Sequence, residues 1–373
     1  MNVIERNIAN GTDKKIADFM VKQKLPYEFK KHYAEVRAWE FYNHEEIAGN
    51  AYVAVGGLDS ITLLLFLRSI GINVPAVSVS VLEDKSIQRI HQQLGVTGLK
   101  PLRSKMEVIQ EFGFPVLSKE IAGKIALLQN PSEKNKTVRH AIITGETGEY
   151  GGNRTGTRMK MPQKWLQLFG GYENENEGVD YCMPDFKVSE KCCYYLKEKP
   201  CDNYMRETGR YPYMGLMASE GGRREKALMI HGCNYISPGT KRSCPFAIFN
   251  RQDILTLALE LNVPVPEIYG EIVRDPDGTL RTTRAQRTGC SMCGFGIHLD
   301  INKRPHHFDM LRDDSPKEWE HWMKNCYTSP YTGERFGWGH VLDYIGVPWE
   351  DDWRLGRNIE GQVNLFEETE SPL

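Results

Sequence analysis

The sequence of 373 residues lacks a long apolar run and lacks an excess of charge of either sign. Its longest apolar stretch, Ile61–Leu67, falls far short of the roughly 18 residues that a membrane-spanning helix needs. The 47 Lys and Arg residues nearly balance the 49 Asp and Glu residues, so bulk charge indicates neither a nucleic-acid nor a membrane-surface partner. The ordinary charged fraction of 26% excludes a disordered, collagen-like or coiled-coil protein. We therefore expect a globular protein that has no membrane partner.

The first 15 residues also lack the apolar segment of a secretory signal peptide, which predicts a cytoplasmic location. In that reducing compartment, cysteines act as metal ligands, nucleophiles or core residues rather than in disulfides. The chain has nine cysteines, an odd number that cannot all pair with one another.

Strand-like and helix-like segments alternate along much of the chain. Residues 14–48 place apolar side chains at helical spacing, residues 51–55 read as a buried strand, and residues 61–70 read as a helix. The other predicted elements are a strand over 74–81, a helix over 86–94, and strands over 141–144 and 213–218. This alternation predicts an α/β fold in which a mostly parallel, Rossmann-like sheet carries helices on both faces.

We expect three parts: an N-terminal helical segment (1–48), a main domain (49–288) and a C-terminal subdomain packed on the sheet (289–373). Within the main domain, the glycine-rich residues 145–178 form an insertion that is either a mobile loop or a partner-binding lid. The insertion contains the basic residues Arg154, Arg158, Lys160 and Lys164. The last residues, 360–373, form an acidic tail.

The strand over 51–55 runs directly into a glycine pair and a helix, in the octapeptide Val-Ala-Val-Gly-Gly-Leu-Asp-Ser (53–60). Gly56 and Gly57 let the backbone approach a ligand closely, and the following helix N-terminus offers unpaired N–H groups to an anion. Asp59 could cap the helix or aid a bound cation, and Ser60 could donate to a phosphate oxygen. The same residues also fit a plain strand-to-helix turn. The pattern matches neither a Walker A loop nor GxGxxG.

Four cysteines occur in two close pairs, Cys192–Cys193 and the CxxC of Cys290 and Cys293. Four thiolates suit zinc or an iron–sulfur cluster. Adjacent cysteines point in different directions, which makes one small ion awkward for both to reach and favours a 4Fe–4S cluster over zinc. A redox-active CxxC beside two buried thiols is the other interpretation.

The octapeptide resembles the PP-loop (Ser-Gly-Gly-x-Asp-Ser) of adenine nucleotide α-hydrolases, with Val55 in place of the first serine. The tandem cysteines, followed far downstream by CxxC, resemble the cluster motif of the PAPS/APS (sulfonucleotide) reductases. Residues 215–224 resemble the family's anion-binding segment; Glu220 and Arg224 match it, whereas Met217 and Gly221 depart from it. Residues 245–254 resemble a further segment of the family. The layout is closest to reductase-like proteins of phages and prophages.

The resemblance implies an adenine nucleotide α-hydrolase-like fold and three ligand sites. A nucleotide, either ATP or an adenylyl sulfate type, optionally with Mg²⁺, would be bound by Gly56, Gly57, Asp59 and Ser60. An anion would be bound by Glu220, Arg223 and Arg224. A 4Fe–4S cluster, with zinc the less favoured occupant, would be ligated by Cys192, Cys193, Cys290 and Cys293.

The reductases carry a nucleophilic cysteine in a C-terminal Glu-Cys-Gly-x-His element, and this sequence has none. Beyond Cys293 the only cysteine is Cys326, which we take with Cys233 as a candidate nucleophile. Cys244 beside the anion-binding segment is either a sulfur acceptor or a buried thiol.

A retained cluster without that nucleophile favours ATP-dependent sulfur transfer to a nucleic-acid acceptor, as in PP-loop thiolation enzymes. The alternatives are a genuine adenylyl or phosphoadenylyl sulfate reductase and a non-catalytic nucleotide- or DNA-binding regulator. The basic residues that would contact a nucleic acid, or form a solvated face, are Arg274, Arg281, Arg284, Arg287, His306 and His307. A sulfur- or electron-donor protein is a further expected partner, and the sequence is compatible with an oligomer.

Overall fold

The computed structural model describes residues 11–146, 159–171, 173–174 and 179–351. The chain divides into two compact units, each of which is described by itself. The first contains residues 1–104 and 193–291, and the second contains residues 105–192 and 292–373. The expected boundary at 288/289 lies close to one division point, but residues 105–192 belong to the second unit rather than to the unit that carries the sheet. Arg154, Arg158 and the tail 360–373 lie outside the described residues.

The first unit is built on a six-stranded sheet of order β3-β2-β1-β7-β9-β8. Its strands are β1 (Ala51–Ala54), β2 (Ala76–Ser78), β3 (Thr97–Gly98), β7 (Tyr211–Met214), β8 (Asn234–Ser237) and β9 (Thr240–Ser243). All neighbours pair in parallel except β8 and β9, which form an antiparallel hairpin. The predicted α/β class with a mostly parallel sheet is confirmed.

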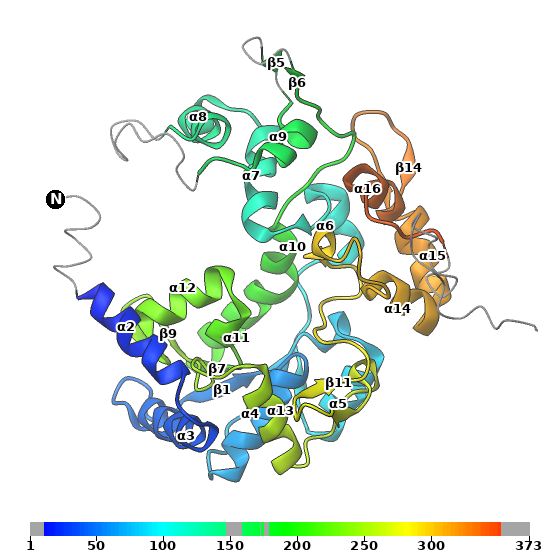
Figure 1. Cartoon of the computed structure of the whole chain (residues 1–373). Coiled ribbons are helices and arrows are strands. Elements are labelled where there is room, and N and C mark those ends of the chain that lie inside the picture. The colour runs from blue at the N-terminus through cyan, green and yellow to red at the C-terminus, as the bar shows by residue number, and fades with distance from the viewer. Residues whose placement is uncertain (1–10, 147–158, 172, 175–178, 352–373) are drawn as a thin grey trace, which may run out of the picture. The chain divides into compact units, whose positions relative to one another are not determined.

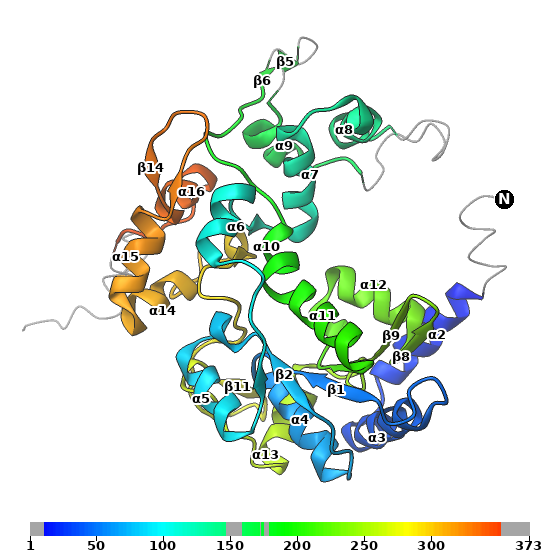
Figure 2. The ribbon, with the colours of Figure 1, turned by 180° about the vertical axis from the view of Figure 1, so that it is seen from behind.

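Helices cover both faces of this sheet. Figures 1 and 2 show α11 and α12 on one side and α3, α4 and α13 on the other. The helices of this unit are α2 (Thr12–Gln23), α3 (Tyr27–Asn43), α4 (Leu58–Ser69), α5 (Lys85–Gln93), α11 (Lys199–Thr208), α12 (Gly222–His231) and α13 (Arg251–Glu260). A π-helix, η3 (Tyr194–Glu198), precedes α11, and short 3-10 helices are η1 (Ser80–Leu82), η4 (Ala218–Glu220) and η5 (Glu267–Tyr269). A separate hairpin joins β10 (Ile272–Arg274) to β11 (Leu280–Thr282).

Two long-range contacts tie the N-terminal helix α3 to this unit. The hydroxyl of Tyr213 in β7 donates to the carbonyl of Ala38, 2.7 Å away, and its ring packs edge-on against Phe41. Lys30 forms a buried ion pair with Asp253 of α13, with 2.8 Å between Nζ and Oδ2. The predicted helical segment 1–48 is therefore part of the sheet-bearing unit over its described residues.

The predicted strand over 141–144 is wrong, because these residues end helix α8 (Lys136–Thr144). Ala141 and Ile142 are buried on the inner side of that helix, and Gly145 stops it in a left-handed conformation with φ of 85°. A run of four apolar or β-branched residues cannot by itself distinguish a strand from the last turn of a helix. The predicted strand over 74–81 is also shorter than expected, since η1 begins at Ser80.

The second unit is mainly helical and has an aromatic core. Its helices are α6 (Lys105–Phe112), α7 (Lys119–Gln129), α8, α9 (Gln163–Phe169), α14 (His307–Asp314), α15 (Pro316–Lys324) and α16 (Trp338–Ile345). The short helix α10 (Lys191–Cys193) contains the point between Cys192 and Cys193 at which the chain passes to the first unit. Its short strand pairs are β4 (Val116–Leu117) with β12 (Gly294–Phe295), β5 (Glu173–Asn174) with β6 (Val179–Asp180), and β13 (Tyr327–Thr328) with β14 (Arg335–Phe336). A 3-10 turn, η2 (Glu133–Asn135), precedes α8, and another, η6 (Ile297–Leu299), follows β12.

The aromatic core of this unit gathers around the buried ring of Phe114. The rings of Tyr327 and Trp338 lie 5.0 and 4.9 Å from it, centroid to centroid, and that of Phe186 lies 5.9 Å away. Tyr327 and Trp338 thus pack against the 105–192 segment of the same unit. None of the described helices in either unit is both long and apolar enough to cross a membrane.

Candidate functional site

The octapeptide 53–60 lies at the carboxyl end of β1, where the chain order of the sheet reverses. β1 pairs with β2 on one side and with β7 on the other. Ligands of open α/β sheets bind at such a switch point, because the connections there leave in opposite directions. The strand ends at Ala54, Val55 is buried, and α4 begins at Leu58.

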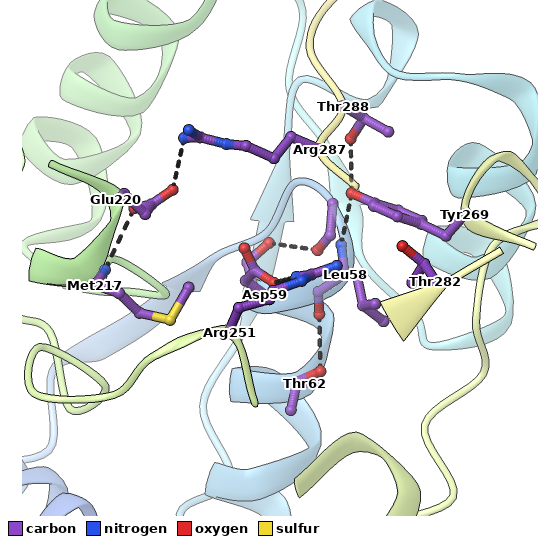
Figure 3. A network of polar contacts seen from close by, with 12 residues as sticks. Leu58, Asp59, Thr62, Met217, Glu220, Arg251, Tyr269, Thr282, Arg287 and Thr288 are labelled. Atoms are coloured by element: carbon purple, nitrogen blue, oxygen red, sulfur yellow. Dashed lines mark hydrogen bonds and ion pairs between the residues drawn. The ribbon is translucent and has the colours of Figure 1, made fainter. Parts of the chain in front are cut away.

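Gly57 is required by close packing rather than by an unusual backbone conformation. Its φ of −78° is open to any residue. A Cβ atom added to it, however, would collide with the hydroxyl of Tyr269 and lie 2.9 Å from Oγ1 of Thr288. Tyr269 Oη lies 2.7 Å from Thr288 Oγ1 and accepts a hydrogen bond of 3.1 Å from the N–H of Leu58, as Figure 3 shows.

The hydroxyl of Ser60 is used inside the loop. It accepts from the N–H of Gly56 at 2.6 Å and donates to the carbonyl of Gly57 at 2.9 Å. The predicted donation from Ser60 to a phosphate would therefore compete with this internal bond. Within the described residues, the N–H groups of Gly57 and Asp59 have no hydrogen-bond acceptor, and both residues line a cavity.

Asp59 does not cap α4. One of its carboxylate oxygens instead pairs with Nη1 of Arg251 at 2.5 Å (Figure 3). Burial raises the pKa of Asp59, and nearby Glu220 raises it further, against the lowering effect of Arg251 and Arg287. The other two guanidinium nitrogens of Arg251, Nε and Nη2, are buried without a hydrogen-bond partner among the described residues.

Glu220 joins two arginines from distant parts of the chain. Its Oε1 lies 2.5 Å from Nη1 of Arg224 and 2.9 Å from Nη2 of Arg287, while Oε2 accepts from the N–H of Met217 at 3.3 Å. The predicted anion-binding residues Glu220 and Arg224 are therefore in contact, and Arg287 is added to them. The side chain of Arg223 lies outside what the structure describes.

The loop and the arginines enclose a cavity of about 220 Å³. It is lined by Ala54, Gly57, Asp59, Ser60, Met214, Gly215, Leu216, Glu220, Arg224, Tyr269, Gln286, Arg287 and Thr288. A larger cavity of about 750 Å³ begins at Val55 and Gly56 and shares Ala54 and Met214 with the first. The sheet face of β1, β2 and β7 and the helix α11 line this larger cavity. The PP-loop-like turn thus lies between a small polar cavity and a larger one.

Two of the four predicted cluster ligands lie close to one ammonium group in the first unit. Lys197 pairs with the buried carboxylate of Glu83 at 2.6 Å. Burial acts to lower the pKa of Lys197, but Cys290, Glu83 and Cys193 together raise it above its usual value. The other two predicted ligands, Cys192 and Cys293, belong to the second unit.

Within the described residues, no group of three or more His, Cys, Asp or Glu side chains is arranged to bind a metal ion. The four-cysteine site therefore stays a prediction from the sequence. Gly294, which follows Cys293, has a structural explanation, because a Cβ there would collide with the ring of Trp338.

The candidate nucleophiles are buried thiols. Burial raises the pKa of Cys233 and of Cys326 to about 12 in each case. Cys326 also donates a hydrogen bond from Sγ to the carbonyl of Trp322 at 3.1 Å. Cys244 is fully buried, lies opposite Cys233 across the β8–β9 hairpin, and has its pKa raised by burial to about 12. A thiol must ionise and be accessible to attack, so none of the three has the surroundings of a nucleophile.

Sequence reasoning missed several residues around the loop, namely His91, Tyr269, Arg251 and Thr288, and took Arg287 only for part of a basic cluster. Nε2 of His91 lies 2.8 Å from the carbonyl oxygen of Gly56. Arg251 lies within residues 245–254 but not at a position that the resemblance specifies, and the other residues belong to no local motif that would have marked them.

No protein-family model matches the chain, and no curated protein matches it either. One solved structure to which it is similar is a phosphoadenylyl-sulfate (PAPS) reductase from Candida auris in a phosphate complex. The two are 13% identical, with 69% of this chain and 98% of that chain covered, and the TM-score is 0.33.

Alkylation rates will separate the buried cysteines from the exposed one. At pH 8, we expect native Cys233, Cys244 and Cys326 to react about a thousandfold more slowly than an ordinary thiol, because a pKa near 12 leaves far less thiolate. Exposed Cys182 serves as the internal control. Iodoacetamide labelling followed by peptide mass spectrometry measures both, and rapid labelling of Cys326 or Cys233 would contradict the assignment.

Proposed function

We propose that this chain is an adenine-nucleotide-dependent enzyme of sulfur metabolism whose nucleotide phosphates bind in the 220 Å³ cavity. The supporting observation is that Gly57 and Asp59, whose N–H groups have no acceptor among the described residues, line this cavity together with Arg224 and Arg287. Backbone N–H groups at a helix N-terminus and guanidinium groups are the donors that proteins use for phosphate. Val55 removes the hydroxyl of the PP-loop serine but leaves these backbone donors in place.

The charges around the cavity also favour an anion. The guanidinium groups of Arg224, Arg251 and Arg287 face the two carboxylates of Asp59 and Glu220. These five groups therefore carry a net positive charge before a ligand binds. The base and ribose fit the adjoining 750 Å³ cavity, whose lining includes the apolar side chains of Val77, Val79, Met205 and Met214.

The sulfur chemistry is assigned from the cysteine pattern. We propose that Cys192, Cys193, Cys290 and Cys293 ligate a 4Fe–4S cluster, which would supply the site at which sulfur is held. The positive charge of Lys197 beside Cys193 and Cys290 suits a cluster whose thiolate ligands make it anionic. The acceptor we propose is a nucleic-acid base, whose oxygen would attack the α-phosphorus of ATP and release pyrophosphate. Sulfide would then displace AMP.

The geometry gives less support to a sulfonucleotide reductase. Such an enzyme needs a reactive thiolate, and the candidates Cys233 and Cys326 are buried with raised pKa values. A regulator that binds nucleotide without turnover would use the same phosphate cavity, so products rather than binding distinguish it.

Neutralising the two cavity arginines will test the phosphate site. We expect the double variant R224Q/R287Q to bind ATP at least about tenfold more weakly, since charge-assisted hydrogen bonds are lost, while adenosine binding is unchanged. Isothermal titration calorimetry measures both ligands. The matched control is R281Q, because Arg281 is half-exposed, pairs with Asp275 and does not line the cavity. Equal losses for ATP and adenosine would contradict a phosphate-specific role.

Iron analysis will test the cluster. Anaerobically purified protein should contain about four iron and four acid-labile sulfide atoms per chain and absorb near about 400 nm. We expect C193S and C290S to lose most of this iron and C182S to retain it. One zinc per chain with no iron would show that the four cysteines form a zinc site instead of a cluster. Absence of both metals would refute the four-cysteine assignment and would leave the conclusion from ATP binding unchanged.

Products will decide between the three functions. The holoprotein should convert ATP to AMP and pyrophosphate only when the nucleic-acid acceptor and a sulfide donor are present, and the acceptor should gain one sulfur atom by mass spectrometry. Sulfite release from an adenylyl sulfate with a thiol donor would instead establish the reductase. Tight ATP binding with neither reaction would indicate the regulator.

A further inference from the structure

The side chain of His91 contacts the PP-loop-like turn but does not line the 220 Å³ cavity. His91 lies in the last turn of α5 and is almost completely buried, with 1% of its surface exposed. Nε2 lies 2.8 Å from the carbonyl oxygen of Gly56, and Nδ1 lies 2.8 Å from the hydroxyl of Ser80. A carbonyl oxygen can only accept a hydrogen bond, so Nε2 carries a proton and donates it. Neutral His91 then accepts from Ser80 at Nδ1.

This contact fixes the direction of one peptide group. The carbonyl of Gly56 and the N–H of Gly57 belong to the same planar trans peptide, so they point in opposite directions. When His91 binds the carbonyl on one side, the N–H of Gly57 points to the other side. Gly57 lines the 220 Å³ cavity, and its N–H has no acceptor among the described residues. Because His91 does not line the cavity, it can influence the direction of this N–H only through the peptide group.

A glycine pair makes such a restraint necessary. Glycine adopts positive and negative φ values with similar ease, so the peptide between Gly56 and Gly57 can rotate at little conformational cost. The reversed peptide would turn the carbonyl oxygen of Gly56 toward the cavity, and its partial negative charge would repel an anion. The N–H of Gly56 is held separately by Ser60 Oγ at 2.6 Å. That bond restrains the preceding peptide and leaves the Gly56–Gly57 peptide to His91.

We propose that His91 is a positioning residue that keeps the Gly56–Gly57 peptide oriented with its N–H toward the bound phosphate. The inference rests on the proposed nucleotide function and adds a residue to it from outside the PP-loop-like segment. His91 contributes to affinity only through the peptide, so its effect depends on the ligand's having a phosphate. A residue that merely supports the fold would affect nucleoside and nucleotide alike.

Substituting His91 by each of the two amide residues will distinguish the roles of its two ring nitrogens. In H91Q, the amide nitrogen reaches the position of Nε2 and can still donate to Gly56. In H91N, the shorter amide reaches only the position of Nδ1 beside Ser80. We expect H91N to bind ATP about tenfold more weakly and H91Q within about threefold of the wild type, with adenosine affinity unchanged in both. Calorimetric titrations of ATP and adenosine give these ratios, and circular dichroism checks the fold.

The outcomes distinguish the inference from the function on which it rests. If wild-type protein binds ATP no better than adenosine, the phosphate site itself is refuted, and the role of His91 falls with it. If phosphate strengthens wild-type binding and folded H91N keeps the same advantage, or loses adenosine binding equally, only the positioning role is refuted.

A measurement on the wild type covers the case in which H91N does not fold. Titration of ¹⁵N-labelled protein with inorganic pyrophosphate should shift the amide proton of Gly57 downfield, because this N–H becomes a hydrogen-bond donor to the anion. A titration that shifts other loop amides while that of Gly57 stays in place would overturn the proposal.

Discussion

The candidate site depends on one constraint, the passage from a buried strand to a buried helix across Gly56 and Gly57. These two residues connect the end of β1 to the start of α4. They must also leave room for the hydroxyl of Tyr269 to accept a hydrogen bond from the N–H of Leu58. Any side chain at Gly57 would occupy the place of that hydroxyl. Within the part of the chain that the structure describes, Tyr269 accepts from the N–H of Leu58, whereas the N–H groups of Gly57 and Asp59 have no acceptor. The chemistry of the loop is thus set by which N–H groups its neighbours do not use.

Local features of this region could be predicted from the sequence, and long-range ones could not. The strand, the glycine pair and the helix over 51–70 are consecutive in sequence, so the local pattern of residues is enough to predict them. Tyr269 and His91 act on the same loop from 211 and 35 residues away, and only the folded sheet brings them there. The partners of the Ser60 hydroxyl could not be predicted from the sequence for a related reason. A hydroxyl at a helix N-terminus can form hydrogen bonds with a ligand or within the loop. Here the hydroxyl of Ser60 is hydrogen-bonded to Gly56 and Gly57.

In the second unit, a single glycine has two explanations, one from a metal motif and one from packing. A glycine beside Cys293 suits the tight turn of a CxxC motif, yet at Gly294 the ring of Trp338 already excludes any larger residue. The same unit contains the last turn of helix α8 over residues 141–144, where a strand was expected. The four apolar or β-branched residues there fit either element, so their pattern could not reveal a helix that ends at Gly145. At Gly294, a ring 44 residues along the chain decides the local structure. The sequence pattern alone does not distinguish that cause from a functional one.

The carboxylate of Glu220 already binds the two guanidinium groups that an incoming phosphate would need. In the proposed phosphate site, these ion pairs would restrain both arginines before a ligand binds, which would lower the conformational entropy lost on binding. Every anion must also compete with Glu220. A singly charged anion such as chloride gains little from that exchange, whereas a polyphosphate brings enough charge to engage the arginines and the loop together. In the proposed phosphate site, Glu220 would therefore select ligands by charge and disfavour the abundant small anions of a cell.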